Sequence, residues 1–285
     1  MLPPIAIFFP LFTLLEDLGY LPRIAFNLDY YFKKACAHGK QALTMCMGFG
    51  CNAAGVIGCR IIDSPRERLI ATITNNFVPC NGRFPTLIAL TAIFIAGNSG
   101  NLSSIVATVT ILFCIISSVF ITLLVSKLLS KTILKGIPSS FTLELPPYRK
   151  PQIGKIILYS IFDRTLFVLG RAVAVAAPSG LIIWILANIT IGDISLITYI
   201  AQFLDPFSRL IGLDGYILLS FILGLPANEI VIPILIMSYM STSSIMELSS
   251  LAETKLLFVK NGLIWLTAVC VMIFSLNHWP CGTTL

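Results

Sequence analysis

The uncharged segment at residues 41–59 constrains this chain most, because two glycines interrupt it where an apolar helix should be strongest. Nineteen uncharged residues could cross a bilayer as one helix, but Gly48 and Gly50 weaken that helix. Backbone that is not helical persists at membrane depth only where protein buries it or where it lines a cavity. The segment is therefore predicted to be a broken helix, with the thiol of Cys51 and the amide of Asn52 at the break.

The same pattern recurs in the second half of the chain. Residues 224–229, which include Gly224, Pro226 and Asn228, align without a gap with residues 48–53 at an offset of 176. The same offset gives the pairs Leu28–Leu204, Asp29–Asp205, Tyr31–Phe207, Lys33–Arg209, Gly39–Gly215 and Asp17–Asp193. This agreement in one register indicates an internal duplication. Two Gly- or Pro-interrupted apolar segments at corresponding places in two halves are a sequence indicator of a transporter's binding site.

The composition is that of a polytopic membrane protein. Hydrophobic residues make up 56% and charged residues 11% of the chain, whereas soluble domains carry roughly 25% charged residues. The net charge of +6 is concentrated in loops, which indicates membrane topology and no nucleic-acid partner. The eight cysteines form no CxxC pair, and no GxxxxGK[ST] sequence occurs, so neither a disulfide framework nor a P-loop is expected.

The charge distribution predicts how the segments enter the membrane. Cytoplasmic loops collect Lys and Arg, and both flanks of residues 41–59 are basic, so that segment is predicted to be a re-entrant hairpin on the cytoplasmic side. Residues 192–214 carry a net charge of −2, which suits the outside. The second hairpin would then enter from the opposite face, which makes the repeats inverted, the arrangement expected of alternating-access transporters.

These patterns predict an all-α, polytopic transmembrane helical bundle in three parts. Residues 1–105 are the first gate repeat, with its re-entrant hairpin at 41–59. Residues 106–170 hold a transmembrane helix, a basic cytoplasmic linker and an interfacial helix. Residues 171–285 are the second gate repeat, with a broken helix at 215–240. Further expectations are a discontinuous helix at 69–95 that breaks around Cys80, and a polar, mobile segment at 247–260.

Several stretches together resemble one family. They are Leu-Leu-Glu-Asp-Leu-Gly-Tyr at 14–20 with Arg23, residues 48–52, residues 136–149 ending in Glu-Leu-Pro-Pro-Tyr-Arg, residues 224–229, and Pro280-Cys281 before Thr283-Thr284. The set resembles FeoB, the bacterial ferrous iron transport protein B, over essentially the whole chain. The gate repeat alone is less specific, because nucleoside transporters and spore-maturation membrane proteins carry similar repeats.

The resemblance implies a transporter and not an enzyme. It implies import of Fe²⁺ by a multi-pass protein of the cytoplasmic (inner) membrane, surrounded by the lipid bilayer. It also implies a GTPase domain, small accessory Feo-type proteins, and association into a homo-oligomer. The family's GTPase half, first membrane helix and last helices are not in this sequence. GTP is therefore expected to act only through a domain outside it, or through a separate GTPase chain.

The resemblance also points to metal-binding residues. Cys51, Cys80 and Cys281 match the family's motif cysteines, and Glu229 is an ionisable residue at the second break. Fe²⁺ is a borderline cation, so a path that selects it over Mg²⁺ and Ca²⁺ is expected to combine sulfur with oxygen ligands. The residues expected to shape the two breaks are Gly48, Gly50, Asn52, Gly224, Pro226 and Asn228.

Other interpretations stay open at this stage. A nucleoside-type transporter would need aromatic and amide groups around a sugar and a base, and transport of another divalent metal is a further alternative. A non-transporting membrane scaffold or receptor would tolerate mutation of Cys51 and Glu229. Free cysteines often pack simply as small hydrophobic residues. Glu229 pairing with Arg83 is the structural alternative to metal binding. His38 and His278 are both expected to be solvated near interfaces.

Overall fold

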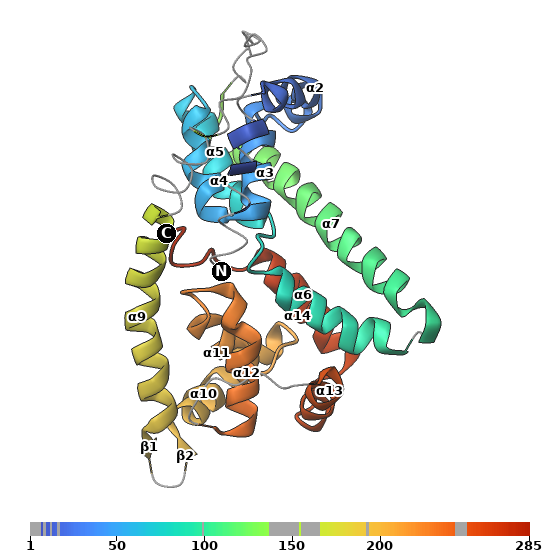
Figure 1. Ribbon diagram of the computed structural model, residues 1–285, viewed down its shortest axis with the longest axis vertical. Helices are drawn as coiled ribbons and strands as arrows, with labels where there is room; N and C mark the ends of the chain where they lie inside the picture. The colour runs from blue at the N-terminus through green and yellow to red at the C-terminus, as the bar shows by residue number, and fades with distance from the viewer. Residues whose placement is uncertain are drawn as a thin grey trace. The chain divides into compact units, whose positions relative to one another are not determined.

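The computed structural model is a helical protein (Figure 1). It describes residues 7, 10–11, 13–15, 18–98, 100–136, 154, 166–191, 194–242 and 250–285. The only strands in these ranges are β1 (Thr190–Ile191) and β2 (Ile194–Ser195), a short antiparallel pair. The prediction of an all-α bundle is confirmed. Contacts divide the chain into two compact units, the first with residues 1–81, 115–171 and 284–285, the second with 82–114 and 172–283.

The first unit is built around α3 (Lys40–Gly50) and α4 (Asn52–Gly58), which pack against each other. Cys51 separates them in an extended conformation, with φ −151° and ψ 122°. The predicted break is thereby confirmed. The remaining elements are α2 (Tyr20–Lys34), which packs on α3, the 3₁₀ turns η1 (Cys59–Ile61) and η2 (Asn75–Phe77), α5 (Pro65–Thr74), and the C-terminal part of α7 (Ser103–Thr132).

A buried polar network joins three helices of the first unit. Gln41 of α3 donates from Nε2 to Thr74 Oγ1 of α5 at 2.9 Å and to Ser126 Oγ of α7 at 3.2 Å. All three side chains are almost fully buried, and each polar atom named here has a partner. The network fixes the first arm of the broken helix to its neighbours. If a partner moved away, a buried hydroxyl or amide would be left without a hydrogen bond, and the folded chain would be less stable.

The second unit contains a second helix pair, α11 (Gly215–Leu223) and α12 (Val231–Met240), which pack against each other. Its other elements are α6 (Phe84–Leu90), the π turn η3 (Thr91–Ile95), the 3₁₀ turns η4 (Ala96–Asn98), η5 (Gly100–Leu102) and η7 (Asn228–Ile230), most of α9 (Leu166–Asn188), α10 (Leu196–Leu210), α13 (Leu251–Lys260) and α14 (Trp265–Asn277). Its largest apolar core includes Leu87, Phe94, Ile217, Phe221, Phe258 and Met272.

Two helices of the described residues are long and apolar enough to cross a membrane, Ser103–Thr132 and Leu169–Asn188. The count rises to four if two bent helix pairs, α10 with α11 and α13 with α14, each form one span. On α7 the large apolar side chains are exposed, while four buried hydroxyls, one on every fourth residue, face protein: Ser118, Thr122, Ser126 and Ser130. Small polar residues on the packed face and apolar residues outside are typical of a helix in lipid.

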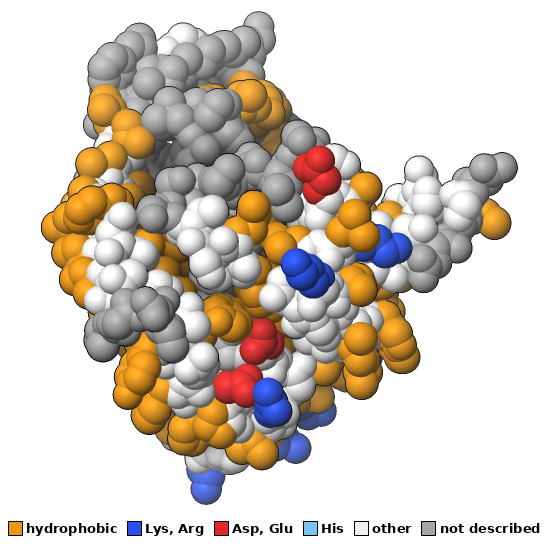
Figure 2. Space-filling model, turned by 90° about the horizontal axis from the view of Figure 1, so that it is seen from below, with side chains coloured by type: hydrophobic (Ala, Val, Ile, Leu, Met, Phe, Trp, Pro, Cys, Tyr) orange, Lys and Arg blue, Asp and Glu red, His pale blue; other side chains and the backbone are white. Residues whose placement is uncertain are grey.

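The surface agrees with a membrane setting. Apolar side chains cover much of the face drawn in Figure 2, and charged side chains are few among the described residues there. The transmembrane helix predicted within residues 106–170 corresponds to α7, which begins at Ser103 and continues to Thr132, with Lys127 and Lys131 on its exposed side. The predicted linker motif at 144–149 lies outside the described residues, as does nearly all of the interfacial helix expected up to residue 170.

The prediction for the segment at residues 247–260 was wrong. Residues 247–260 were expected to be polar and mobile, but residues 251–260 form the helix α13, which packs into the core. Thr254 and Phe258 are both buried, and because they are one helical turn apart they lie on one face of that helix. Phe258 belongs to the main apolar core, so tertiary packing outweighs the polar composition of the segment.

Candidate functional site

Each unit has the same hydrogen bond just before its broken helix. In the first unit, the backbone N–H of Gly39 donates to Asp29 Oδ1 at 3.0 Å. In the second unit, the backbone N–H of Gly215 donates to Asp205 Oδ1 at 3.3 Å. The two aspartates are related by the offset of 176 found in the sequence, and so are the two glycines. The duplication seen in the sequence is therefore also present in the local structure.

The same two turns share an ion pair and a close backbone approach. Asp29 binds Lys33 at 2.6 Å, and Asp205 binds Arg209 at 2.7 Å. A Cβ added to the turn glycine of the first unit would lie 2.9 Å from the carbonyl oxygen of Ala25, and in the second unit 2.1 Å from that of Ala201. Because real Cβ atoms do not approach so closely, only glycine fits at either turn.

The two breaks have the same backbone conformation. Ala227 has φ −154° and ψ 116°, close to the values of Cys51, its equivalent in the first repeat. Each is followed by an asparagine that starts the next helical turn, Asn52 or Asn228, and both asparagines are buried. At Gly224 a Cβ would lie 2.6 Å from Cγ2 of a valine in α12, so this glycine allows the two arms to pack closely. That the two hairpins enter from opposite faces stays a prediction.

At the first break, an asparagine that the sequence analysis did not single out lies between the two arms. Asn75, at the end of α5, donates from Nδ2 to the main-chain oxygen and to Oδ1 of Asn52, both at 3.4 Å. A Cβ on Gly48 would lie 2.8 Å from Asn75 Oδ1, and one on Gly55 would lie 2.4 Å from Asn75 Nδ2. Glycines on both arms thus make room for one amide.

The predicted thiols of the first unit lie on the two chain segments that meet near the break. Cys51 is half-buried at the break, and Cys80 is buried in the extended segment after η2. The next residue, Asn81, donates its backbone N–H to the carbonyl oxygen of Gly50 at 3.4 Å. This carbonyl belongs to the last residue of α3, where the helix leaves its oxygens without intrahelical partners.

The second unit has a similar contact, with its acceptor shifted by one residue relative to the repeat. Gly282 donates its backbone N–H to the carbonyl oxygen of Leu225 at 2.7 Å, and Cys281 Sγ lies 2.9 Å from Thr283 Oγ1. Glu229 is half-buried and lines a cavity of about 220 Å³ whose walls are otherwise mostly apolar. Apolar walls strengthen the attraction between a carboxylate and a cation, because they lower the local dielectric constant.

A second repeat, at an offset of 201, explains why the two contacts are alike. Residues 76–80, Asn-Phe-Val-Pro-Cys, match residues 277–281, Asn-His-Trp-Pro-Cys, as an Asn-x-x-Pro-Cys motif that the sequence analysis missed. The helices before them correspond too, since Thr74 of α5 and Ser275 of α14 are related by the same offset and are both buried. The second half is longer than the first between hairpin and motif, and α13 lies in that interval.

Two further residues of the second unit have roles that the sequence did not indicate. Arg83 is 1% exposed and donates from Nη1 to the carbonyl oxygen of Leu276 at 3.0 Å and from Nη2 to that of His278 at 3.1 Å, which caps α14. The prediction of a solvated His278 was wrong: the side chain is buried between Phe221 and Phe274, with ring centroids 5.0 and 5.9 Å away. Its Nε2 lies 3.4 Å from Asn228 Oδ1 at the second break.

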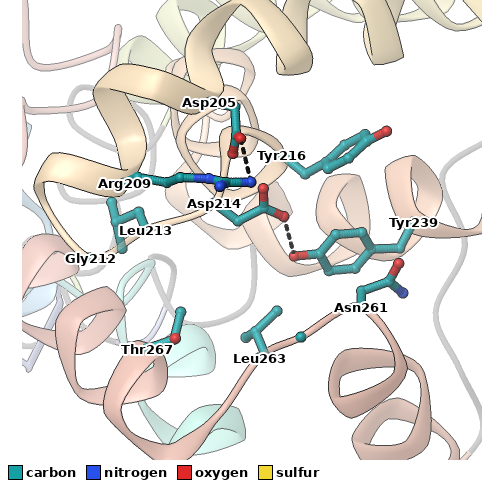
Figure 3. Close-up of a pocket in the computed structure, with 11 residues that line it drawn as sticks. Asp205, Arg209, Gly212, Leu213, Asp214, Tyr216, Tyr239, Asn261, Leu263 and Thr267 are labelled. Carbon is teal, nitrogen blue, oxygen red and sulfur yellow. Dashed lines mark hydrogen bonds and ion pairs between the residues drawn. The ribbon is translucent and has the colours of Figure 1, made fainter.

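A polar cavity of about 370 Å³ lies beside the turn between α10 and α11 (Figure 3). Its lining includes Asp205, Arg209, Asp214, Tyr216, Tyr239, Asn261 and Thr267. Tyr239 donates its hydroxyl to Asp214 Oδ2 at 3.0 Å, and its ring lies 5.4 Å from that of Tyr216. In the first repeat the positions of the two tyrosines are taken by Lys40 and Asp63, which form an ion pair at 2.7 Å. The two halves therefore use one pair of positions for different chemistry.

His38 lies at the turn that precedes the first broken helix, and it is buried, so the prediction that it is solvated was wrong. The Nδ1 atom of His38 accepts a hydrogen bond from the backbone N–H of Lys40 at 3.0 Å. Burial lowers the pKa of His38 below its usual value, although the Coulombic attraction of Glu67 opposes that shift. At the exposed end of the same cluster, the hydrogen bond from Lys40 lowers the pKa of Asp63.

The candidate metal ligands are distributed over both units. Cys51 and Cys80 belong to the first unit, while Glu229 and Cys281 belong to the second. Within the described ranges, no three His, Cys, Asp or Glu side chains lie close enough together to hold a metal ion. The assignment of these four residues as ligands stays a prediction, and the thiols and the carboxylate stand at or beside the two breaks.

Two family models match the chain. The model described as "Gate: Nucleoside recognition" matches residues 1–94 and 169–285, and the model "Ferrous iron transport protein B C terminus" matches residues 111–163. Together they cover both repeats and the region between them. None of the solved structures matches the chain.

Curated relatives agree with these models. An Fe(2+) transporter FeoB of Helicobacter pylori is 30% identical over 70% of this chain and 30% of its own length. Those of Staphylococcus aureus and Methanocaldococcus jannaschii are 27% and 28% identical over 99% of this chain. The chain spans 41% and 42% of their lengths. With two broken helices, two matching family models and relatives along nearly its whole length, the chain belongs to the FeoB family.

Proposed function

We propose that this chain is the membrane part of an Fe²⁺ uptake transporter. The observation that carries the proposal is the duplicated break: in each unit an extended residue interrupts the helix, and a Pro-Cys segment donates an N–H to the freed end of the first arm. Broken helices supply carbonyl oxygens and dipoles to ions at the centre of a transporter. The relatives named as Fe(2+) transporters support the choice of cation.

In this proposal, sulfur and oxygen ligands together select Fe²⁺ over other divalent cations. Cys51, Cys80 and Cys281 provide thiols, which a borderline cation accepts better than Mg²⁺ or Ca²⁺ does, and Glu229 provides a carboxylate. No step needs all four at once. A transported ion has to leave again, so a few ligands met in sequence serve better than a closed cage.

In this proposal, the two hairpins are the parts that move during transport. With the repeats inverted, each hairpin opens the path to one side of the cytoplasmic (inner) membrane in turn. A GTPase domain outside this sequence, or a separate GTPase chain, drives or regulates that motion, and GTP acts only there. Small accessory Feo-type proteins and further copies of the chain are the expected partners.

Uptake into liposomes tests the proposal. The chain is reconstituted with and without a separate GTPase domain, and Fe²⁺ entry is followed with an internal chelator dye under reducing conditions. Cys51→Ser and Cys80→Ser are expected to reduce uptake, whereas Cys46→Ser, at an exposed thiol of α3, is the matched control. Absence of metal-dependent flux in both preparations would sink the proposal. Full uptake by both variants would remove those thiols as essential ligands.

A nucleoside transporter is the second candidate, since the matched gate model is described by nucleoside recognition. The polar cavity of the second unit also offers aromatic and amide groups, from Tyr216, Tyr239 and Asn261. Uptake of labelled uridine by the same liposomes separates the two. The Fe²⁺ proposal expects no uridine entry and no competition between uridine and Fe²⁺.

A further inference from the structure

We propose that Asn75 is a cation-binding residue of the first hairpin, with its side-chain carbonyl Oδ1 as an oxygen ligand to the transported divalent cation. This inference rests on the proposed transport function and assigns a residue to it that the cysteine pattern does not include. Asn75 is 1% exposed, although its side chain is a primary amide. It lies where α3, α4 and η2 meet, beside the break at Cys51.

The central observation is a pair of buried amide atoms without protein partners. Among the described residues, Asn75 Oδ1 and Asn52 Nδ2 are fully buried and have no hydrogen-bond partner, while Asn75 Nδ2 and Asn52 Oδ1 face each other at 3.4 Å. Such orphan groups are uncommon in folded proteins, because burial without a partner is costly. In each amide, one polar atom faces the neighbouring amide, and the other polar atom can bind a ligand.

Exchanging the oxygen and nitrogen of the two amides does not remove the orphan groups. If both amides are turned over, Asn52 donates to Asn75, and one donor and one acceptor are again left over. That arrangement also places Asn75 Oδ1 toward the main-chain oxygen of Asn52, where two acceptors repel each other. The orientation with Asn75 Nδ2 on both oxygens of Asn52 is therefore the favoured one, and it leaves Asn75 Oδ1 as the orphan acceptor.

Glycines on the two arms make room for the amide of Asn75 between them. A Cβ on Gly48 would lie 2.8 Å from Asn75 Oδ1, so any other residue at that position would displace this oxygen. The other arm carries Gly55 against Asn75 Nδ2, again without a side chain. In the second unit the corresponding contact is different, because Asn228 faces the imidazole of His278. The orphan amide pair thus belongs to the first hairpin alone among the described residues.

The chemistry of this oxygen suits a divalent cation. Amide carbonyls coordinate Ca²⁺, Mg²⁺ and harder transition-metal ions, and a neutral ligand binds more weakly than a carboxylate, which favours release. Together with the thiol of Cys51 at the same break, an uncharged oxygen would provide the mixed ligand set expected of a path for a borderline cation. The orphan donor of Asn52 is left to a water molecule or to an anionic ligand that accompanies the ion.

The test compares three variants of the full chain in liposomes and in detergent. Asn75→Leu replaces the amide by an apolar group of similar size, Asn75→Asp keeps an oxygen and adds charge, and Thr74→Val is the matched control. The control removes a buried partner of Gln41 from the neighbouring position, without touching the break. Fe²⁺ uptake gives KM and kcat, equilibrium binding of Fe²⁺ gives affinity, and thermal unfolding gives stability.

The ligand role predicts a pattern that a structural role does not. Asn75→Leu should raise KM and weaken binding by roughly ten- to a hundredfold, the value of one contact to a charged group, in addition to the stability that it loses with the hydrogen bonds to Asn52. Asn75→Asp should bind more tightly and turn over more slowly. Thr74→Val should lower the unfolding temperature and leave KM unchanged.

Four results would overturn the inference, and the last of them would also overturn the proposed function. Wild-type affinity in Asn75→Leu, or a loss of stability in it with no change of KM, would show that Asn75 only packs. A wild-type chain that transports Fe²⁺ while Asn75→Leu does so equally well would remove Asn75 and leave the transporter standing. A wild-type chain that neither transports nor binds Fe²⁺ would remove both. A chain that binds without transporting would remove the transport function alone, and the binding series would still decide the role of Asn75.

Discussion

Asp29 and Asp205, equivalent positions of the two repeats, accept the same hydrogen bond, each from the backbone N–H of the glycine that precedes a broken helix. Each aspartate also forms an ion pair with the basic side chain one helical turn later, Lys33 or Arg209. The carboxylate thus connects the end of one helix with the start of the broken one. The two turns are equivalent in sequence, hydrogen bonding and charge.

Asp29→Ala should destabilise the first unit by about 2 kcal/mol, because Asp29 is buried and a hydrogen bond to a charged group contributes about 1.5–3 kcal/mol. Asp29→Asn, which keeps an acceptor for the N–H of Gly39, should lose less. The change is measured by thermal unfolding in detergent. Equal losses in both variants would mean that the ion pair, and not the hydrogen bond, holds this turn.

Gly215→Ala should destabilise the chain by about 3 kcal/mol or more, because the new Cβ would meet the carbonyl oxygen of Ala201 at 2.1 Å. Gly170→Ala is the control, because a Cβ at this helical glycine has nothing within 4 Å. It should stabilise the helix by about 0.5–1 kcal/mol. Chemical unfolding of the two variants gives both values, and equal stability would contradict the close approach at the turn.

Arg83→Met should cost about 2–4 kcal/mol, since it leaves buried carbonyl oxygens at the end of α14 without their donor. Arg83→Lys keeps the charge but not the planar fork that reaches several carbonyls at once, so it should recover only part of that loss. Thermal unfolding measures both. A fully stable lysine variant would show that charge alone is needed at this position.

Acid should loosen the turn before the first broken helix. Because burial lowers the pKa of His38 in the folded chain, the neutral ring is favoured there, and protons bind more readily to the unfolded chain. The stability from His38 is complete above its unfolded pKa of about 6.5 and falls as the pH drops below that value toward the folded pKa. Protonated Nδ1 can no longer accept from the N–H of Lys40.

The charges around His38 act in both directions. Glu67, Asp29 and Asp63 favour the protonated ring, and Lys40 opposes it. Unfolding temperatures at pH 7.5 and 5.5 test the balance, with His38→Asn as a variant that can accept but cannot titrate in this range. The wild type should lose more stability than the variant on acidification. Parallel curves would assign the pH dependence to another group.

The sequence predicted the helix breaks well, because glycine and proline weaken a helix at the position where they occur. Cys51 and Ala227 are extended at the positions where the pattern predicts that the helices break. The offset of 176 also relates the residues of the two equivalent turns, and composition alone does not indicate that relation. The offset of 201 was equally visible in the Asn-x-x-Pro-Cys motif, but the insertion that holds α13 hides it from a single ungapped alignment.

Side-chain environments were harder to predict. His278 was expected near solvent because it follows an apolar helix, yet aromatic rings from two helices enclose it. Asn75 is an ordinary polar residue in the sequence, and its importance arises only when Gly48 and Gly55 are brought to its two sides. Such positions depend on contacts between distant residues, which periodicity and motif spacing do not contain.

The pair Lys40–Asp63 in one half and Tyr216–Tyr239 in the other occupies one structural position with two chemistries. Dissolved salt weakens an exposed ion pair by screening but leaves two packed aromatic rings almost unaffected. Ionic strength therefore distinguishes this pair of positions in one repeat from the equivalent pair in the other. After the duplication, the two copies of the pair came to differ in how far their contribution to stability depends on dissolved salt.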